Sequence, residues 1–146
     1  MFETLDEVRR DWLGRLARAP RDRKCAMHTP VVVSAPADAR VMVLRAFDQA
    51  AARLRFHTDA RSPKVAAIAA DPRMAVLFYD KSAKIQIRAR GLGRIESAGP
   101  VADAAWAAGT NFARRCYLGE GPGASRRCRH RACRPNSKAL SLMMRN

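Results

Sequence analysis

Short segments with the residue pattern of β-strands follow one another closely through the middle of the chain. They are residues 29–35, 40–47, 52–58, 74–79 and 84–97. Strands joined by short turns pair in antiparallel fashion, because parallel pairing needs a crossover of a dozen or more residues. The spacing therefore predicts a mainly β fold, a small barrel of about six strands with peripheral helices.

The apolar residues are distributed differently in the individual strand segments. Residues 52–58 alternate apolar and polar side chains, which is typical of a half-exposed strand. Residues 74–79, MAVLFY, form a continuous apolar run, which indicates a strand buried on both faces. The segment 84–97 alternates again, and its glycines at positions 91 and 93 predict a bend or bulge.

Helices are expected at three places around these strands. Residues 3–18 have apolar side chains at helical spacing, and Thr4 with Glu7 has the form of a capping box. Ser62 followed by a proline is suited to begin a second helix, whose body is KVAAIAA at 64–70. Residues 99–109 supply the third.

The chain is strongly basic, and the excess is concentrated at its end. It has 28 Lys and Arg against 13 Asp and Glu, a formal net charge of +15. Residues 121–146 hold seven of the basic residues and no acidic ones, which leaves 21 against 13 in residues 1–120. We therefore expect one domain over residues 1–120 and a basic, disordered tail over 121–146. Nucleic-acid binding is disfavoured, because aromatic residues do not interleave the arginines.

The length of the apolar runs, the N-terminal residues and the cysteines bear on where the protein is expected in the cell. No apolar run is long enough to span a membrane, and the charged N-terminus is unlike a signal peptide. A cytoplasmic protein is expected, with reduced thiols at its four cysteines. Cys128, His130 and Cys133 have an untypical spacing for zinc, so no metal site is expected.

Several residues have the chemistry of a site for a phosphorylated heterocycle. Arg40 and Arg45 bracket one strand segment, and Thr58, Ser62 and Lys64 surround a turn that leads into a helix. The amino-terminal end of a helix favours phosphate through its free N–H groups and its dipole. The amide of Gln86 lies on the polar side of another strand segment and can both donate and accept hydrogen bonds.

Taken together, these segments resemble the pyridoxamine 5'-phosphate oxidase-like, FMN-binding split-barrel family over roughly residues 3–118. RVMVLR at 40–45 is similar to the family's R-x-V-L-L-K strand, and HT at 57–58 to its aromatic-Thr pair. SPK at 62–64 is similar to its Ser-Arg-Lys, and Gln86 to its ring-contacting glutamine. The resemblance implies a split β-barrel, FMN as cofactor, and a homodimer with each flavin site built across the subunit interface. It implies these cofactor-binding residues: Arg40, Val41, Met42, Val43, Leu44, Arg45, His57, Thr58, Ser62, Lys64 and Gln86.

The chain departs from the family mainly in the half of the site that would hold the substrate. Arg45 replaces a substrate-contacting lysine, and Pro63 replaces a phosphate-binding arginine. Asn111 stands where the family's substrate-phosphate segment has arginine, and nothing after Leu118 resembles the closing strands of the barrel. The expected substrate is a small molecule of the pyridoxine phosphate type, and no catalytic residue is assigned.

Three functions remain open from the sequence. The first is a flavin-dependent two-electron oxidoreductase, in which the cofactor carries the chemistry and the protein binds and orients it. The second is a flavin-binding protein without catalytic activity. The third is a basic protein that binds nucleic acid.

Overall fold

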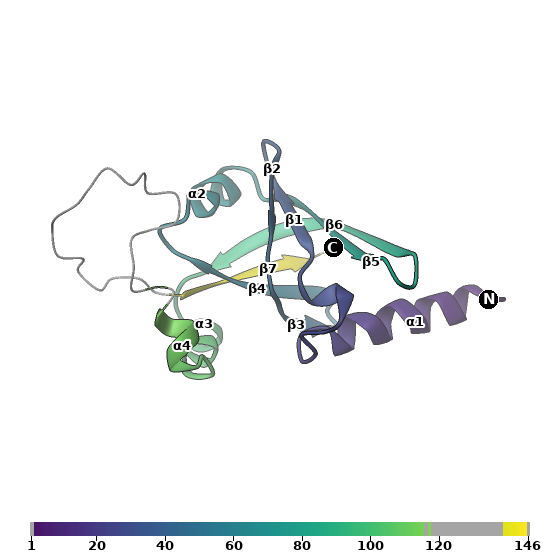
Figure 1. Ribbon diagram of the computed structural model, residues 1–146. Coiled ribbons are helices and arrows are strands. Elements are labelled where there is room, and N and C mark those ends of the chain that lie inside the picture. Colours follow the sequence, from purple (N-terminus) through teal and green to yellow (C-terminus); the bar gives the residue numbers. More distant parts are fainter. Residues whose placement is uncertain (1, 116, 118–138, 146) are drawn as a thin grey trace, which may run out of the picture.

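The computed structural model describes residues 2–115, 117 and 139–145, and these form an antiparallel β-structure with helices around it (Figure 1). The helices are α1 (Leu5–Arg18), the short 3-10 helix η1 (Ala26–His28), α2 (Pro63–Ala70), α3 (Pro100–Ala107) and α4 (Asn111–Arg115). The strands are β1 (Val31–Ser34), β2 (Asp38–Val41), β3 (Leu44–Asp48), β4 (Arg53–Asp59), β5 (Arg73–Asp80), β6 (Ile85–Glu96) and β7 (Ala139–Arg145).

The seven strands form one sheet in the order β2-β1-β5-β6-β7-β4-β3, and every pairing is antiparallel. The two edge strands, β2 and β3, are consecutive in the chain but pair with different neighbours. Among the described residues the barrel is therefore open between β2 and β3. The expectation of a mainly β fold with peripheral helices is confirmed.

The expected single strand over residues 40–47 is instead two strands, and this part of the prediction is wrong. β2 pairs with β1, β3 pairs with β4, and Met42 and Val43 lie between them. The backbone N–H of Met42 donates to the carbonyl of Pro30 at 3.0 Å, and the Met42 side chain is buried. The chain thus leaves one half of the barrel and enters the other within two residues.

β7 is a strand that the sequence analysis did not expect. Residues 139–145 lie between β4 and β6 and pair with both, so the predicted tail over 121–146 does not hold for this segment (Figure 1). Residues 121–138 lie outside the described residues. The facing edges of β4 and β6 expose backbone donors and acceptors, and an inserted strand satisfies them. Pairing with two edges therefore outweighs the segment's lack of a clear periodicity.

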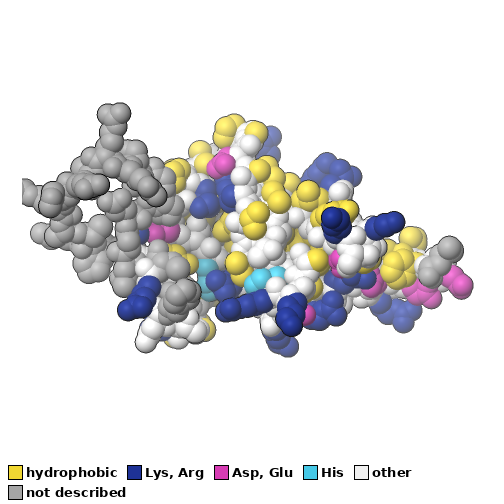
Figure 2. Space-filling model, in the orientation of Figure 1, with side chains coloured by type: hydrophobic (Ala, Val, Ile, Leu, Met, Phe, Trp, Pro, Cys, Tyr) yellow, Lys and Arg dark blue, Asp and Glu magenta, His cyan; other side chains and the backbone are white. Residues whose placement is uncertain are grey.

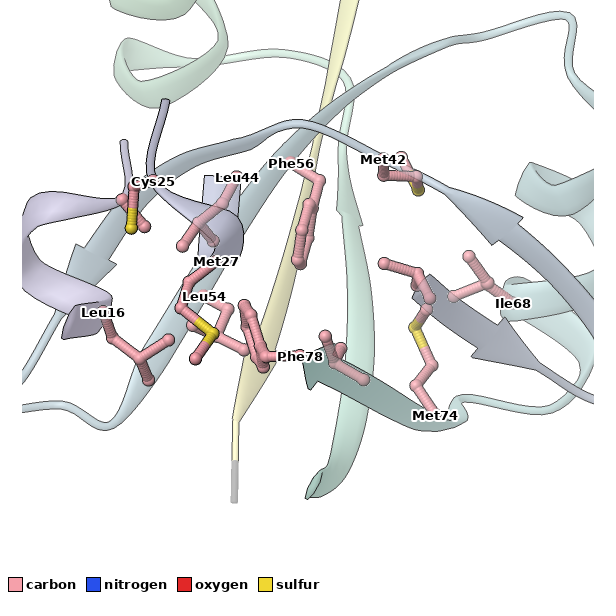
Figure 3. Close-up of a cluster of buried hydrophobic side chains, with 13 residues drawn as sticks. Leu16, Cys25, Met27, Met42, Leu44, Leu54, Phe56, Ile68, Met74 and Phe78 are labelled. Atoms are coloured by element: carbon pink, nitrogen blue, oxygen red, sulfur yellow. The ribbon is translucent and has the colours of Figure 1, made fainter. Parts of the chain in front are cut away.

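The core lies between the two halves of the sheet and is built from aromatic and aliphatic side chains (Figure 3). Phe56 of β4 and Phe78 of β5 are both 0% exposed. Leu16 of α1 and Met27 of η1 lie near Phe78 in the close-up, so the amino-terminal segment closes this end of the core (Figure 3). Burying a side chain of this size stabilises the fold by about 1.5–3 kcal/mol.

Both predicted helix starts are confirmed, and one of them differs in detail. Thr4 and Glu7 form the complete capping box of α1. Ser62 occupies the N-cap of α2 with Pro63 after it, but its side chain makes no bond to the helix backbone. Within the described ranges, no helix is both long and apolar enough to cross a lipid bilayer.

The two glycines of β6 do not interrupt the strand, so the expected bulge is absent from its pairings with β5 and β7. β6 pairs with β5 from Ile85 to Leu92 and with β7 from Leu92 onward without a register shift. Gly93 is required by close packing instead. A Cβ atom there would lie 2.2 Å from Sδ of Met74 and 3.1 Å from Cγ2 of Ile68.

We expect Gly93→Ala to destabilise the protein by about 1–3 kcal/mol, because the buried Met74 and Ile68 would have to move. The matched control is Gly14→Ala on α1, where an added Cβ meets nothing within 4 Å. That change should raise stability by about 0.5–1 kcal/mol through helix propensity. Urea unfolding followed by circular dichroism measures both, and a neutral Gly93→Ala would contradict the packing argument.

Candidate functional site

A cavity of about 260 Å³ opens where the chain passes from β2 to β3. Its walls come from the end of β2, the two-residue interruption, the start of β3, the end of β4 and the first turn of α2. Eight of the residues named from the sequence line it: Arg40, Val41, Met42, Val43, Arg45, His57, Thr58 and Lys64. The fold thus brings together groups that are up to 24 positions apart in the chain.

Lys64 is held at the centre of a small polar cluster. Its Nζ donates to Thr58 Oγ1 at 3.2 Å and to Ser62 Oγ at 2.5 Å. Ser62 therefore belongs to the cluster through Lys64, although it does not line the cavity itself. Burial lowers the pKa of Lys64, and the neighbouring Arg40 lowers it further. A lysine in this setting gains from an anion that restores the favourable environment of its charge.

Arg40 is the second cation, and its guanidinium is fixed by β1. Nη1 and Nη2 both donate to Ser34 Oγ at 3.0 Å, and Arg40 also forms an ion pair with the exposed Asp38. Only 16% of the Arg40 side chain is exposed. Sequence reasoning missed Ser34. Its signal was available in the β1–β2 hairpin, where Ser34 pairs with Asp38 and thus stands beside the strand that carries Arg40.

The turn between β4 and α2 is fixed by a carboxylate. Asp59 is 5% exposed and accepts hydrogen bonds from the backbone N–H of Arg61 at 2.8 Å and from its Nη2 at 2.7 Å. The Arg61 guanidinium lowers the pKa of Asp59, so this carboxyl group stays ionised. Arg61 Nη2 also donates to the carbonyl of Tyr117 at 3.1 Å. The turn that presents Ser62 and Lys64 is therefore anchored on both sides.

His57 occupies a position that disfavours its charged form. Burial lowers its pKa to about 4, and the guanidinium groups of Arg45 and Arg55 add to the shift. Its Nε2 is buried and has no hydrogen-bond partner among the described groups. At neutral pH the ring is therefore uncharged, with one nitrogen available to a ligand.

Two of the named residues lie elsewhere. Leu44 is 0% exposed and belongs to the core rather than to the cavity. Gln86 lies on β6 and lines a different cavity of about 710 Å³, between α1 and the strands β3 and β6. Within one chain, Gln86 is thus separated from the cluster around Lys64.

Residues 15–97 match the model of a known domain, the FMN-binding domain of pyridoxamine 5'-phosphate oxidase. The chain belongs to this family. The match covers the strands, the turn and the helix start that form the cavity. No curated protein matches the chain significantly.

Solved structures show the same fold. An FMN-binding protein of Nostoc punctiforme PCC 73102, related to pyridoxamine 5'-phosphate oxidase, superimposes with a TM-score of 0.70 at 21% identity, covering 93% of this chain and 78% of its own. General Stress Protein 26 of Bacillus anthracis str. Sterne gives 0.57 at 18% identity, covering 90% and 85%. A Listeria innocua protein named after the same oxidase gives 0.59 at 17% identity, covering 94% and 91%. The split-barrel prediction is confirmed.

The low pKa of His57 predicts a pH dependence of stability. The unfolded chain, with an ordinary histidine pKa of about 6.5, binds this proton before the folded chain does. As far as His57 is concerned, the free energy of unfolding should therefore be highest above pH 6.5. It should fall as the pH decreases toward 4, the pKa of His57 in the folded state. In the variant His57→Phe this loss should be smaller. Urea unfolding between pH 7 and 4.5 measures the difference, and identical pH profiles would contradict the placement of His57.

Proposed function

We propose that this protein binds FMN non-covalently and acts as a flavin-dependent oxidoreductase. The observation that supports this most directly is the convergence of Lys64 and Arg40 on one cavity beside the Thr58 hydroxyl. Membership of an FMN-binding domain family supports the same proposal.

The donor set is suited to the terminal phosphate of FMN. In the described residues, the lining of this cavity contains two arginines and a lysine but no Asp or Glu. Charge-assisted bonds from such cations to phosphate oxygens are the strong ones. The beginning of α2 adds the positive end of a helix dipole at Ser62 and Lys64. A phosphate dianion would relieve the repulsion between Arg40 and Lys64.

The segment between β2 and β3 is suited to the remainder of the cofactor. Val41, Met42 and Val43 line the cavity, and Val43 is part of neither strand. Its backbone groups are outside the strand pairings and can meet the polar edge of a flavin ring. When bound, FMN supplies the ability to accept two electrons from a reduced donor and to pass them to an acceptor. The role of this chain is to bind the phosphate and to orient the ring.

A homodimer would complete this site. A cavity of about 260 Å³ lies below the roughly 300–1,000 Å³ of typical ligand sites, and Gln86 lies in another cavity. A second copy could contribute Gln86. Large apolar side chains are exposed on the sheet, with Val41 at 66%, Tyr79 at 54% and Leu92 at 56%. Figure 2 shows hydrophobic side chains between groups of Lys and Arg over the region of β1 and β2.

A dimer predicts a particle of twice 16.2 kDa in light scattering. Tyr79→Glu should shift it toward the monomer, because a buried unpaired carboxylate is costly at an interface. The same variant should weaken FMN binding if Gln86, which pairs with Tyr79 across β5 and β6, comes from the partner. A monomeric wild type that binds FMN tightly would contradict this arrangement.

We expect the protein to bind FMN in preference to riboflavin, which lacks the phosphate. Arg40→Ala and Lys64→Ala should each weaken FMN binding by about 1.5–3 kcal/mol, because each removes charge-assisted bonds to the phosphate. Riboflavin binding should hardly change in either variant. Quenching of flavin fluorescence on titration with protein measures both ligands.

The matched control for this prediction is Arg9→Ala, which removes one positive charge from an exposed position on α1. It should leave FMN affinity unchanged at physiological ionic strength, because screened surface charges act only over about 8–10 Å. Equal affinity of the wild type for FMN and riboflavin would show that the cavity is not a phosphate site.

The oxidoreductase proposal is tested by turnover with the loaded protein. Reduced nicotinamide is supplied as electron donor together with an artificial acceptor, and acceptor reduction is compared with free FMN at the same concentration. We expect a faster rate with the protein, since positioning of the reactants lowers the barrier. Equal rates would favour a flavin-binding protein without catalytic activity.

A further inference from the structure

The carboxylate of Asp80, the last residue of β5, fixes the turn that leads into β6. Its Oδ1 accepts hydrogen bonds from the Ser82 N–H at 3.0 Å, the Ser82 hydroxyl at 2.6 Å and the Ala83 N–H at 3.1 Å. The bond from the Ser82 hydroxyl and that from the Ala83 N–H lower the pKa of Asp80, so the group is ionised at neutral pH. A carboxylate that bonds to the residues after it stabilises a tight turn.

The other oxygen of Asp80 joins this turn to α1. Its Oδ2 lies 3.0 Å from Nη1 of Arg15, and Nε of the same arginine lies 2.7 Å from Oδ2 of Asp11. The Arg15 and Asp80 side chains are only 20% and 14% exposed, so solvent screens this ion pair less than one on the open surface. In Figure 1 the turn between β5 and β6 lies beside α1. One guanidinium thus connects the helix to the turn.

The cavity of about 710 Å³ between α1 and the sheet lies next to this junction. Trp12 of α1 lines one side, and residues 85–90 of β6, with Gln86 among them, line another. Asp80 and Arg15 do not line it themselves. They therefore act from outside the cavity, on the segments that form its walls.

Gln86 is one residue pair away from Asp80 in the pairing of β5 with β6. Asp80 lies opposite Ile85, and Tyr79 lies opposite Gln86. Gln86 is exposed, so packing restricts its side chain little and the backbone of β6 decides where its amide lies. A displacement of the turn would therefore be passed directly to Gln86.

The backbone of this turn is strained. Lys84, the residue before β6, has φ of 55°, in the left-handed region that favours glycine. Among the described residues, the two non-glycine residues with positive φ, Ala52 and Lys84, both line the cavity that contains Gln86. Strained backbone persists only where its surroundings fix it, and it is enriched at ligand sites. The hydrogen bonds of Asp80 supply such surroundings for Lys84.

We infer that Asp80 is a positioning residue for Gln86. By fixing the β5–β6 turn and joining it to α1 through Arg15, it holds the Gln86 amide where the ring of a bound flavin meets it. The flavin part of this inference rests on the proposed function, in which a second copy supplies Gln86. Asp80 lines neither the cavity around Lys64 nor that of Gln86, so its effect on flavin passes through Gln86.

The first test uses the full-length protein without flavin. Hydrogen exchange is compared in the wild type, Asp80→Ala and the matched control Asp71→Ala. Asp71 also accepts a backbone N–H, that of Arg73 at 3.1 Å, and also pairs with an arginine, but at the opposite end of β5. Asp80→Ala should raise exchange in residues 81–88 and in α1, because local opening exposes amides, and Asp71→Ala should not. Circular dichroism checks that both variants are folded.

A milder variant, Asp80→Asn, separates the two roles of the carboxylate. It keeps an acceptor oxygen for the turn and loses the charge that binds Arg15. Exchange in α1 should rise as it does in Asp80→Ala, while exchange in residues 81–88 should rise less. This variant also serves as the test if Asp80→Ala does not fold.

The second test is titration with FMN and with riboflavin. Asp80→Ala should weaken the binding of both by a similar factor of at least about threefold, because it acts on the ring and not on the phosphate. In the background of Gln86→Ala the same change should weaken binding less than about twofold, since the amide that Asp80 positions is absent. A merely structural role would give the same loss in both backgrounds.

Unchanged exchange in residues 81–88, or equal losses of flavin affinity with and without Gln86, would overturn the inference. Failure of the proposed function looks different. In that case the wild type binds neither flavin, while the exchange difference between Asp80→Ala and Asp71→Ala remains. Failure of the inference alone appears as wild type and Asp80→Ala binding FMN equally tightly.

Discussion

The two-residue interruption between β2 and β3 is the constraint on which the rest of the structure depends. Up to Val41 the chain pairs with β1, and from Leu44 it pairs with β4. Met42, between the two strands, is held by its hydrogen bond to Pro30, just before β1, and by its buried side chain. Had the strand continued, Arg40 and Arg45 would belong to one uninterrupted edge. Because it stops, both line one cavity together with residues of β4 and α2.

The main electrostatic feature of the first cavity is a lining that carries two arginines and a lysine and, among the described residues, no Asp or Glu. Around the first cavity, Arg40 lowers the pKa of Lys64, and Arg45 and Arg55 lower that of His57. Repulsion between these cations lowers the stability of the folded protein when no anion is bound, and a bound anion relieves that repulsion. The buried carboxylate of Asp59 is bound to Arg61 and fixes the turn.

The parts of the fold that sequence reasoning predicted correctly are those set by local chemistry. The capping box of Thr4 and Glu7, the start of α2 at Ser62 and the position of β5 each depend on residues close in the chain. The expected burial of β5 on both faces is wrong, because burial alternates along the strand and Tyr79 is 54% exposed. The parts that it missed depend on distant partners. β2 ends where pairing with β1 stops and pairing of the next strand, β3, with β4 begins. β7 forms because the edges of β4 and β6 are both available to pair with it. Gly93 has its role because Met74 and Ile68 press against it, and no local pattern indicates that contact.

The same distinction between local and distant interactions applies to the candidate site. The sequence by itself determined the chemical groups: the two arginines around residues 40–45, the Thr58–Ser62–Lys64 cluster, and the helix start that joins them. Those positions are close in the chain, so their spacing already limits their geometry. Only the tertiary structure decided that Gln86 lies in another cavity and that Ser34 orients Arg40. These relations depend on which strands become neighbours, and strand pairing is a property of the whole sheet rather than of any segment within it.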